Sequence, residues 1–333
     1  MYILGIESSC DETSAAVVRM GEGERVICSN IVASQIETHR LYGGVVPEIA
    51  SRAHIEAVSN ITYDSLRKAG IGISDIGAVA VTSHPGLIGA LLVGVNFAKS
   101  LAYSYNIPLV PVDHIKAHTA AAYLSDASLE PPFLALVVSG GHTSIYRVES
   151  YNSFEEIGGT RDDAAGEAFD KIGRVIGLPY PGGAAIDKLA YEGNATAIAL
   201  PSPALGGDTL DLSFSGIKTA ALNYINSERQ QGHEIARADL AASYTHAIVN
   251  AITKKARLAL KQTGMRRLVL AGGVAANSHL RAALEDMCKK QNVRLSVPPL
   301  SLCGDNAAMV AAAGYFEYLD GNFADTSLNA SAI

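Results

Sequence analysis

The sequence lacks several features that mark common protein classes. It contains no Trp, and only 6% of its 333 residues are aromatic, so we expect a core of Ala, Val, Leu and Ile. It contains no uninterrupted apolar run long enough to span a bilayer. The first residues, Met1–Glu7, lack a basic segment and predict a strand, not a signal peptide. Together these absences predict a protein with no membrane association.

Cysteine and positive charge are also scarce. The four cysteines, Cys10, Cys28, Cys288 and Cys303, form no Cys-x-x-Cys pair, so we expect no disulfide framework and a cytoplasmic location. The formal net charge of -7 argues against a free-standing nucleic-acid binder. A nucleic-acid substrate remains compatible with this charge if a local basic patch or a partner holds it. One candidate patch comprises Lys254, Lys255, Arg257, Lys261, Arg266 and Arg267. A solvated helix face is the ordinary explanation of such a run of charges.

The length and the 48% hydrophobic content favour two domains with substantial cores. Apolar periodicity and turn residues predict strands over 2–7, 13–19, 25–31, 78–82, 108–112, 133–138, 143–148 and 268–270. They predict helices over 47–69, 87–105, 163–176, 183–192, 215–227 and 236–263, with others starting after residue 112 and near residues 277 and 305.

The opening pattern of strand, polar turn and strand recurs after Pro131-Pro132, which marks a domain boundary. This recurrence indicates a weak internal duplication. We therefore expect an N-terminal domain over 1–130, to which 305–333 returns, and a C-terminal domain over 131–304.

His114 and His118 are the most informative pair of residues. Four residues apart on one helix, they lie on the same face and can bind one metal ion. A peptidase of the His-Glu-x-x-His type is not expected, because Ile115 occupies the position of its general base. Asp305 is a candidate third ligand, although an aspartate at a loop-to-helix junction is also a good N-cap.

Glycine-rich turns suggest a nucleotide. Ser139-Gly140-Gly141 follows a strand, and its backbone N–H groups are placed to approach an anion, although an ordinary hairpin turn explains it too. The segment 271–277, which ends at Asn277, joins a strand to a helix N-terminus that favours anionic or polar atoms. Gly183 and Asp187 open another helix. Asp170 either pairs with Lys171 or Arg174 at the surface, which we favour slightly, or faces a ribose hydroxyl.

Two acidic residues, Asp11 and Glu12, lie in the first turn. Paired acids in such a loop can position a nucleophile or a metal-bound water, and a solvated turn is a competitive alternative.

Taken together, these motifs resemble the bacterial branch of the universal TsaD family, which makes threonylcarbamoyladenosine in tRNA and was formerly described as an O-sialoglycoprotein endopeptidase family. The resemblance covers nearly the whole chain. Its motifs are residues 5–13, 42–48 with 51–54, His114 with His118, 138–143, 162–171, 180–183, 213–219 and 305–309. It implies the actin/sugar-kinase/Hsp70-like (ASKHA) fold, an α/β fold with two related domains around a nucleotide cleft.

The resemblance also implies a site and a reaction. His114, His118 and Asp305 would bind iron or zinc. The threonylcarbamoyl-AMP substrate would contact Val137, Val138, Ser139, Gly140, Gly141, Asp170, Gly183, Asp187 and Asn277. The threonylcarbamoyl group would pass to N6 of adenosine 37 in tRNAs that read codons beginning with A, and AMP would leave.

Bacterial relatives act with an inactive paralogue, TsaB, and an ATPase, TsaE, and we expect the TsaB interface within 47–69. The chain departs from the family pattern at two positions. Val137 replaces a tyrosine ligand of archaeal and eukaryotic relatives, and His84 replaces a glycine before Pro85-Gly86. A small-molecule kinase and a non-catalytic paralogue of the same fold are the alternative functions.

Overall fold

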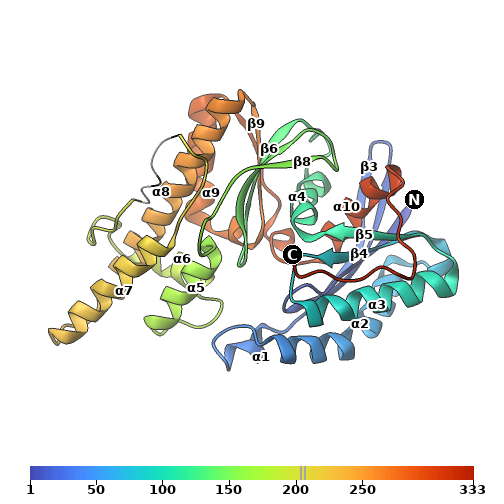
Figure 1. Cartoon of the computed structure of the whole chain (residues 1–333), viewed down its shortest axis with the longest axis horizontal. Helices are drawn as coiled ribbons and strands as arrows, with labels where there is room; N and C mark the ends of the chain where they lie inside the picture. Colours follow the sequence, from blue (N-terminus) through green and yellow to red (C-terminus); the bar gives the residue numbers. More distant parts are fainter. Residues whose placement is uncertain (203–204, 206–207) are drawn as a thin grey trace. The chain divides into compact units, whose positions relative to one another are not determined.

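The computed structural model describes residues 1–202, 205 and 208–333 (Figure 1). The chain divides into two compact units. Unit 1 comprises Met1–Pro131, Ser150–Phe154 and Pro298–Ile333, and unit 2 comprises Pro132–Glu149 and Glu155–Val297. Each unit is built around one five-stranded sheet flanked by helices.

In unit 1 the strand order is β3-β2-β1-β4-β5, with β1, β2 and β3 antiparallel and β1, β4 and β5 parallel. The strands are β1 (Tyr2–Glu7), β2 (Glu12–Gly21), β3 (Glu24–Ser34), β4 (Ile76–His84) and β5 (Leu109–Asp113). The helices are α1 (Ile36–Arg40), α2 (Pro47–Ala69), α3 (Ile88–Tyr105), α4 (His114–Ser125) and α10 (Ala307–Leu319), with short 3-10 turns η1 (Ile73–Asp75) and η4 (Leu300–Leu302).

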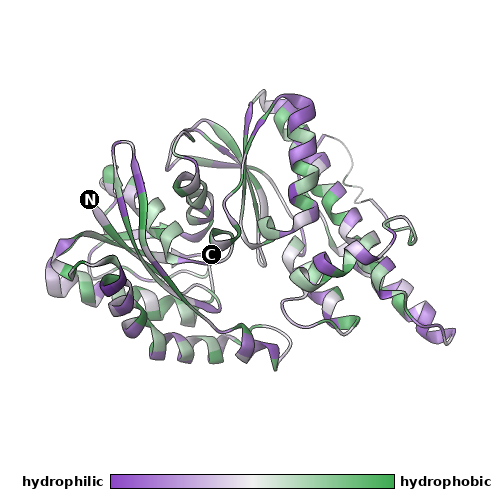
Figure 2. Cartoon of the chain, turned by 180° about the vertical axis from the view of Figure 1, so that it is seen from behind, coloured by the Kyte–Doolittle hydropathy of each residue, from purple (hydrophilic) through white to green (hydrophobic). Residues whose placement is uncertain are grey.

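The core of unit 1 forms where α2 and α3 cover the sheet. Leu4 and Ile6 of β1 and Val79 and Val81 of β4 are fully buried in one cluster, into which α2 inserts Val58. Both α2 and α8 carry hydrophilic and hydrophobic residues along their length (Figure 2). Such helices gain most of their stability from packing one apolar face.

Helix α10 is different, because almost all of its residues are buried. It crosses the sheet of unit 1 so closely that a Cβ on Gly5 would lie 2.1 Å from the carbonyl oxygen of Ala307. A Cβ on Gly314 would likewise lie 2.3 Å from the Cβ of Ala80. The two glycines therefore allow α10 to pack directly against β1 and β4.

Unit 2 repeats the plan with the strand order β10-β9-β6-β7-β8. Its strands are β6 (Phe133–Val138), β7 (Thr143–Val148), β8 (Phe154–Gly159, whose first residue belongs to unit 1), β9 (Arg267–Ala271) and β10 (Arg294–Ser296). Its helices are α5 (Ala165–Val175), α6 (Gly182–Leu189), α7 (Ser215–Gln230), α8 (Arg237–Thr263) and α9 (Ser278–Gln291), with 3-10 turns η2 (Ala190–Glu192) and η3 (Gly273–Ala276).

The two sheets have the same topology. In each, the first strand pairs antiparallel with the strand that follows it, as β1 does with β2 and β6 with β7. In each, the first strand also pairs parallel with a later strand, as β1 does with β4 and β6 with β9. The internal duplication predicted from the two strand–turn–strand patterns is therefore present. Within the described residues, no helix combines the length and the apolar character needed to cross a membrane.

Candidate functional sites

The two histidines predicted to bind metal lie on the first turns of α4. Strand β5 ends at Asp113, whose side chain accepts hydrogen bonds from the N–H groups of Ile115 (2.7 Å) and Lys116 (3.2 Å) and so caps the helix. The helix starts at His114, which places His118 one turn later on the same face. Their ring centroids lie 4.5 Å apart, and both side chains are buried.

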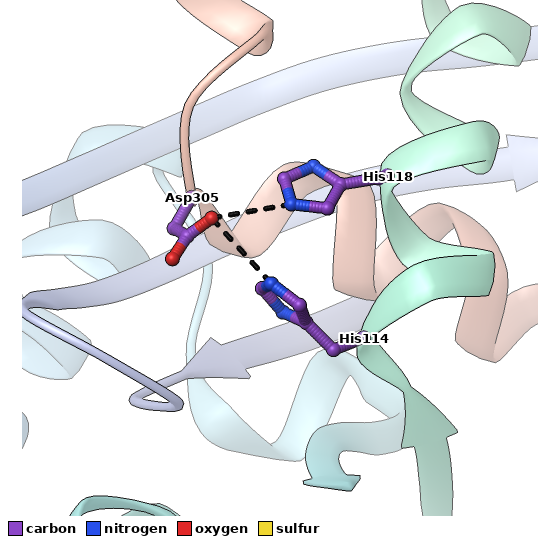
Figure 3. Close-up of side chains that lie close together, drawn as sticks. All are labelled: His114, His118 and Asp305. Carbon is purple, nitrogen blue, oxygen red and sulfur yellow. Dashed lines mark ion pairs between the residues drawn. The ribbon is translucent and has the colours of Figure 1, made fainter. Parts of the chain in front are cut away.

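Asp305 lies between η4 and α10 with its carboxylate directed at the two histidines (Figure 3). Its Oδ1 is 3.3 Å from Nε2 of His118 and 3.6 Å from Nε2 of His114. Asp305 is not the N-cap of α10, the alternative that its position in the sequence left open. Asn306 has that role, because its side chain accepts a hydrogen bond from the N–H of Met309 at 3.1 Å.

These three side chains fit a metal ion. Ligands held about 2.1 Å from a tetrahedral metal lie roughly 3.4 Å from one another, close to the two separations from Asp305. Their ligand atoms all lie within 4.8 Å of one another. Both ring nitrogens of His118 are buried without a hydrogen-bond partner in the described part of the chain, an arrangement that is costly unless another group satisfies them.

A buried carboxylate, Glu7 at the end of β1, lies behind His114. Its Oε2 is 3.1 Å from Nδ1 of His114, and the hydroxyl of Ser9 is 3.2 Å from the same nitrogen. Burial acts to lower the pKa of His114, but the nearby carboxylates of Asp305 and Glu7 raise it to about 9. Glu7 was not predicted as a site residue, because only the folding of β1 into the sheet brings it beside His114 of α4.

The predicted catalytic acids occupy the connection into β2. Glu12 is the first residue of β2. The carboxylate of Glu12 accepts a hydrogen bond from the hydroxyl of Ser34 at 2.7 Å. Burial, followed by the charge of Asp11, raises the pKa of Glu12 to about 8. His54 of α2 holds this connection through Thr13 Oγ1 (2.7 Å from Nδ1) and the carbonyl of Cys10 (2.9 Å from Nε2).

In unit 2, the predicted anion-binding turn closes between β6 and β7. The N–H of Ser139 donates to the carbonyl of His142 at 2.8 Å, and Gly140 and Gly141 are exposed in open space. Val137 and Val138 are fully buried in β6. The turn rests on the start of α5, where the N–H of Gly166 donates to the carbonyl of Ser139 at 3.2 Å.

Four other residues predicted to contact the substrate connect the helices around this turn. Asp170 of α5 accepts a hydrogen bond from the N–H of Gly183 in α6 at 3.0 Å. Asp187 of α6 accepts from the N–H and the hydroxyl of Ser278 at the start of α9, at 3.0 and 2.8 Å. Asn277 caps α9 by accepting from the N–H of Leu280 at 2.8 Å. The Nζ of Lys171, one suggested partner of Asp170, lies near Asp163 and Glu167.

The six basic residues of the candidate patch lie on α8 and around the start of β9. Lys255 donates to the carbonyl of Thr209 at 2.5 Å, and burial lowers its pKa. Lys254, Arg257, Lys261 and Arg266 are exposed. Lys255 therefore has a structural contact within unit 2.

Comparison with known proteins identifies the family. The family described as TsaD, tRNA N6-adenosine threonylcarbamoyltransferase, matches residues 26–312. A tRNA N6-adenosine threonylcarbamoyltransferase of Clostridioides difficile (strain 630) is 50% identical over 327 residues, which are 98% of this chain and 96% of the relative. The chain belongs to the TsaD family. The resemblance drawn from its motifs is thereby confirmed.

Solved structures with low identity support the fold of this TsaD family member. HypF in a phosphate- and nucleotide-bound form gives a TM-score of 0.62 at 16% identity, over 96% of this chain and 46% of HypF. The ROK hexokinase of Thermus thermophilus gives 0.51 at 16% identity, over 96% of this chain and 100% of the hexokinase. The predicted ASKHA fold is confirmed. The TsaD family is metal-dependent in general, and His114, His118 and Asp305 form a candidate metal site in this member.

Proposed function

We propose that this chain transfers the threonylcarbamoyl group of threonylcarbamoyl-AMP to N6 of adenosine 37 in tRNAs that read codons beginning with A. A C–N bond forms between the carbamoyl carbon and N6, the bond from that carbon to the phosphate oxygen breaks, and AMP leaves. N6 loses one proton in the process. The observation that carries the proposal is the convergence of His114, His118 and Asp305 in a chain whose relatives are named for this activity.

We assign His114, His118 and Asp305 as the residues that hold one divalent metal, iron or zinc. Imidazole nitrogens and a carboxylate oxygen suit both metals, and three protein ligands leave coordination positions for substrate oxygens. When bound, the metal supplies Lewis-acid polarisation and offsets phosphate charge. Val137 offers no ligand atom in its side chain, so a fourth protein ligand from this position is not part of the proposal.

The acids Asp11 and Glu12 are our candidates for handling the proton released from N6. A general base is most effective when its pKa lies near the working pH, and the raised pKa of Glu12, about 8, meets that condition. His54 holds the connection that carries both acids. Because N6 of adenine is a weak nucleophile, orientation of the two substrates supplies much of the rate.

The adenylate is proposed to bind through unit 2. Gly140 and Gly141 are exposed, and a turn without Cβ atoms lets a phosphate approach its backbone. The start of α9, where Asn277 is the cap, presents a helix N-terminus of the kind that favours anionic groups. The further contacts are assigned to Val137, Val138, Ser139, Asp170, Gly183 and Asp187.

TsaB and TsaE are the proposed partners, and the cytoplasm is the proposed location. The outer side of α2, which is one continuous helix over Pro47–Ala69, exposes Ile55 and Tyr63. Apolar side chains exposed on a helix suit a protein interface. Ile55→Lys and Tyr63→Lys should abolish TsaB binding in pull-down and calorimetry, whereas Leu319→Lys at the exposed end of α10 should not. Normal TsaB binding by both folded α2 variants would contradict this interface.

The function is tested by transfer of labelled threonylcarbamoyl from its adenylate to tRNA, with TsaB and TsaE present. We expect His114→Ala and Asp305→Ala to lose transfer while remaining folded, and His233→Ala, at an exposed histidine of unit 2, to retain it. No transfer by the unmodified chain to any tRNA would overturn the proposal. ATP-dependent phosphorylation of a sugar would then favour the kinase alternative.

A further inference from the structure

Glu7 is a fully buried carboxylate in the middle of unit 1. It is the last residue of β1, which pairs with β2 on one side and β4 on the other. A buried carboxylate is strongly destabilising unless hydrogen bonds and a positive charge compensate it. In the described part of the chain, its ion-pair partner is His114, and no Lys or Arg lies within ion-pair distance.

Two donors fix the carboxylate of Glu7 in place. The N–H of Ser9 donates to Oε1 at 2.6 Å, and the hydroxyl of Thr82 on β4 donates to Oε2 at 2.7 Å. Because both are donors, Glu7 presents acceptor oxygens to its remaining neighbour. That neighbour is Nδ1 of His114, 3.1 Å from Oε2.

This contact determines which nitrogen of His114 faces the metal ligands. A bound metal would take the place of the second proton of His114, and the neutral imidazole that donates from Nδ1 then keeps its lone pair on Nε2. Nε2 of His114 is the atom that lies 3.6 Å from Oδ1 of Asp305. The ring is therefore held between a carboxylate behind it and the metal position in front of it, the arrangement in which an outer carboxylate orients a metal-bound histidine.

The charges lead to the same assignment. With both imidazoles neutral, Glu7 and Asp305 bring two negative charges to a site whose side chains are buried or half-buried. The carboxylate of Asp113 also acts on His114. A divalent cation offsets this negative charge, to which Glu7 contributes from a fully buried position.

We propose that Glu7 is a positioning residue of the metal site, which holds His114 with its proton on Nδ1 and contributes buried negative charge beside a bound dication. The inference rests on the metal site of the proposed function, and it assigns to Glu7 a role distinct from those of the three ligands. Glu7 acts through His114 and makes no contact with the metal itself.

The test is metal affinity, measured without any catalytic assay. The chelator-treated full chain is titrated with Zn²⁺ in competition with a chromophoric chelator, and Co²⁺ absorption reports the ligand geometry. Glu7→Gln, which keeps the shape and removes the charge, should weaken Zn²⁺ binding about 10- to 100-fold. Glu7→Asp, which keeps the charge and withdraws it from Nδ1, should also weaken binding and alter the Co²⁺ spectrum.

The matched control is Glu317→Gln. Glu317 is another buried carboxylate of unit 1, and its partners are Lys116 and Asn322 rather than a proposed metal ligand. Its replacement should leave Zn²⁺ affinity unchanged. A structural loss caused only by removing a buried charge would weaken binding in the control as well, and that result would overturn the assignment to Glu7.

The protonation pattern of His114 provides an independent readout. Long-range ¹H–¹⁵N spectra of the Zn²⁺-loaded chain should show His114 protonated at Nδ1 and bound through Nε2, with its signals identified by their loss in His114→Ala. Binding through Nδ1, or wild-type Zn²⁺ affinity in both Glu7 variants, would overturn the inference and leave the proposed function standing. Failure of the unmodified chain to bind Zn²⁺, Co²⁺ or Fe²⁺ would instead overturn the metal site, and this inference with it.

Discussion

Gly5 of β1 lies directly beneath Ala307, the first residue of α10. A Cβ at Gly5 would be 2.1 Å from the carbonyl oxygen of Ala307 and 2.8 Å from the N–H nitrogen of Ala311. Both neighbours are backbone atoms, so neither can rotate away. Asp305 precedes this helix by two residues, and the packing of β1 against α10 therefore helps to place the third candidate ligand.

Gly5→Ala should accordingly damage both stability and the metal site. To admit the methyl group, β1 and α10 must separate, at a cost of about 1–3 kcal/mol or more in the free energy of unfolding. Zn²⁺ affinity should fall as Asp305 moves. The control is Gly21→Ala in β2, where a Cβ would have no atom within 4 Å. Urea denaturation and Zn²⁺ titration of both variants check this, and equal effects of the two would contradict it.

Periodicity and turn chemistry predicted most of the fold. The expected strand over 2–7 and the expected helix over 47–69 match β1 and α2 at both ends. The short strands β8 and β10 and the helix α1 were not predicted. Strand β10 has three residues and is defined by its pairing with β9, a contact that no local pattern records.

The candidate site was only partly predictable, for a similar reason. The spacing of His114 and His118 follows from helix geometry, so the sequence was sufficient to pair them. Asp305 is almost 190 positions later, and its own sequence context favoured an N-cap as strongly as a ligand. Apart from its place in a family motif, nothing in the sequence marked Glu7 as part of the site. Its role depends on contacts with Thr82 of β4 and His114 of α4, which only the folded chain brings together.

His54 should make stability depend on pH. Its burial lowers its pKa below 6.5, so the folded chain binds fewer protons than the unfolded chain as the pH falls through this range. Stability is thus complete above pH 6.5 and decreases as the pH falls toward the lowered pKa. Denaturation at pH 5–8 should show a smaller decrease in His54→Gln, whose amide can still bond Thr13 and Cys10. The same pH profile in His54→Gln as in the unmodified chain would contradict this role of His54. The control is His246→Gln, at an exposed helix position.

Glu12 should make stability depend on pH in the opposite direction from His54, with stability lost as the pH rises. Its folded pKa of about 8 exceeds the ordinary value of 4.5, so the folded chain binds more protons than the unfolded chain between these pH values. Its contribution to stability is complete below pH 4.5 and is lost as the pH rises through about 8. Glu12→Gln should remove that loss and become more stable than the unmodified chain above pH 8. Glu48→Gln, at an exposed ion pair with Arg52, should not.

Asp187 and Ser278 should behave as a coupled pair. The carboxylate of Asp187 accepts hydrogen bonds from both the N–H and the hydroxyl of Ser278. It also lies 2.7 Å from Nδ1 of His279. These contacts connect α6 to the start of α9. Asp187→Asn should reduce the free energy of unfolding by about 1–3 kcal/mol, because charge-assisted hydrogen bonds in a half-buried position are lost. Ser278→Ala removes one of the same hydrogen bonds.

A double-mutant cycle of Asp187→Asn and Ser278→Ala should therefore give a coupling energy of about 0.5–3 kcal/mol. Asp239→Asn is the control, since Asp239 accepts from Asn194 and shares no hydrogen bond with Ser278. Additive effects of Asp187→Asn and Ser278→Ala would contradict this coupling, because they would show that the two residues contribute to stability separately.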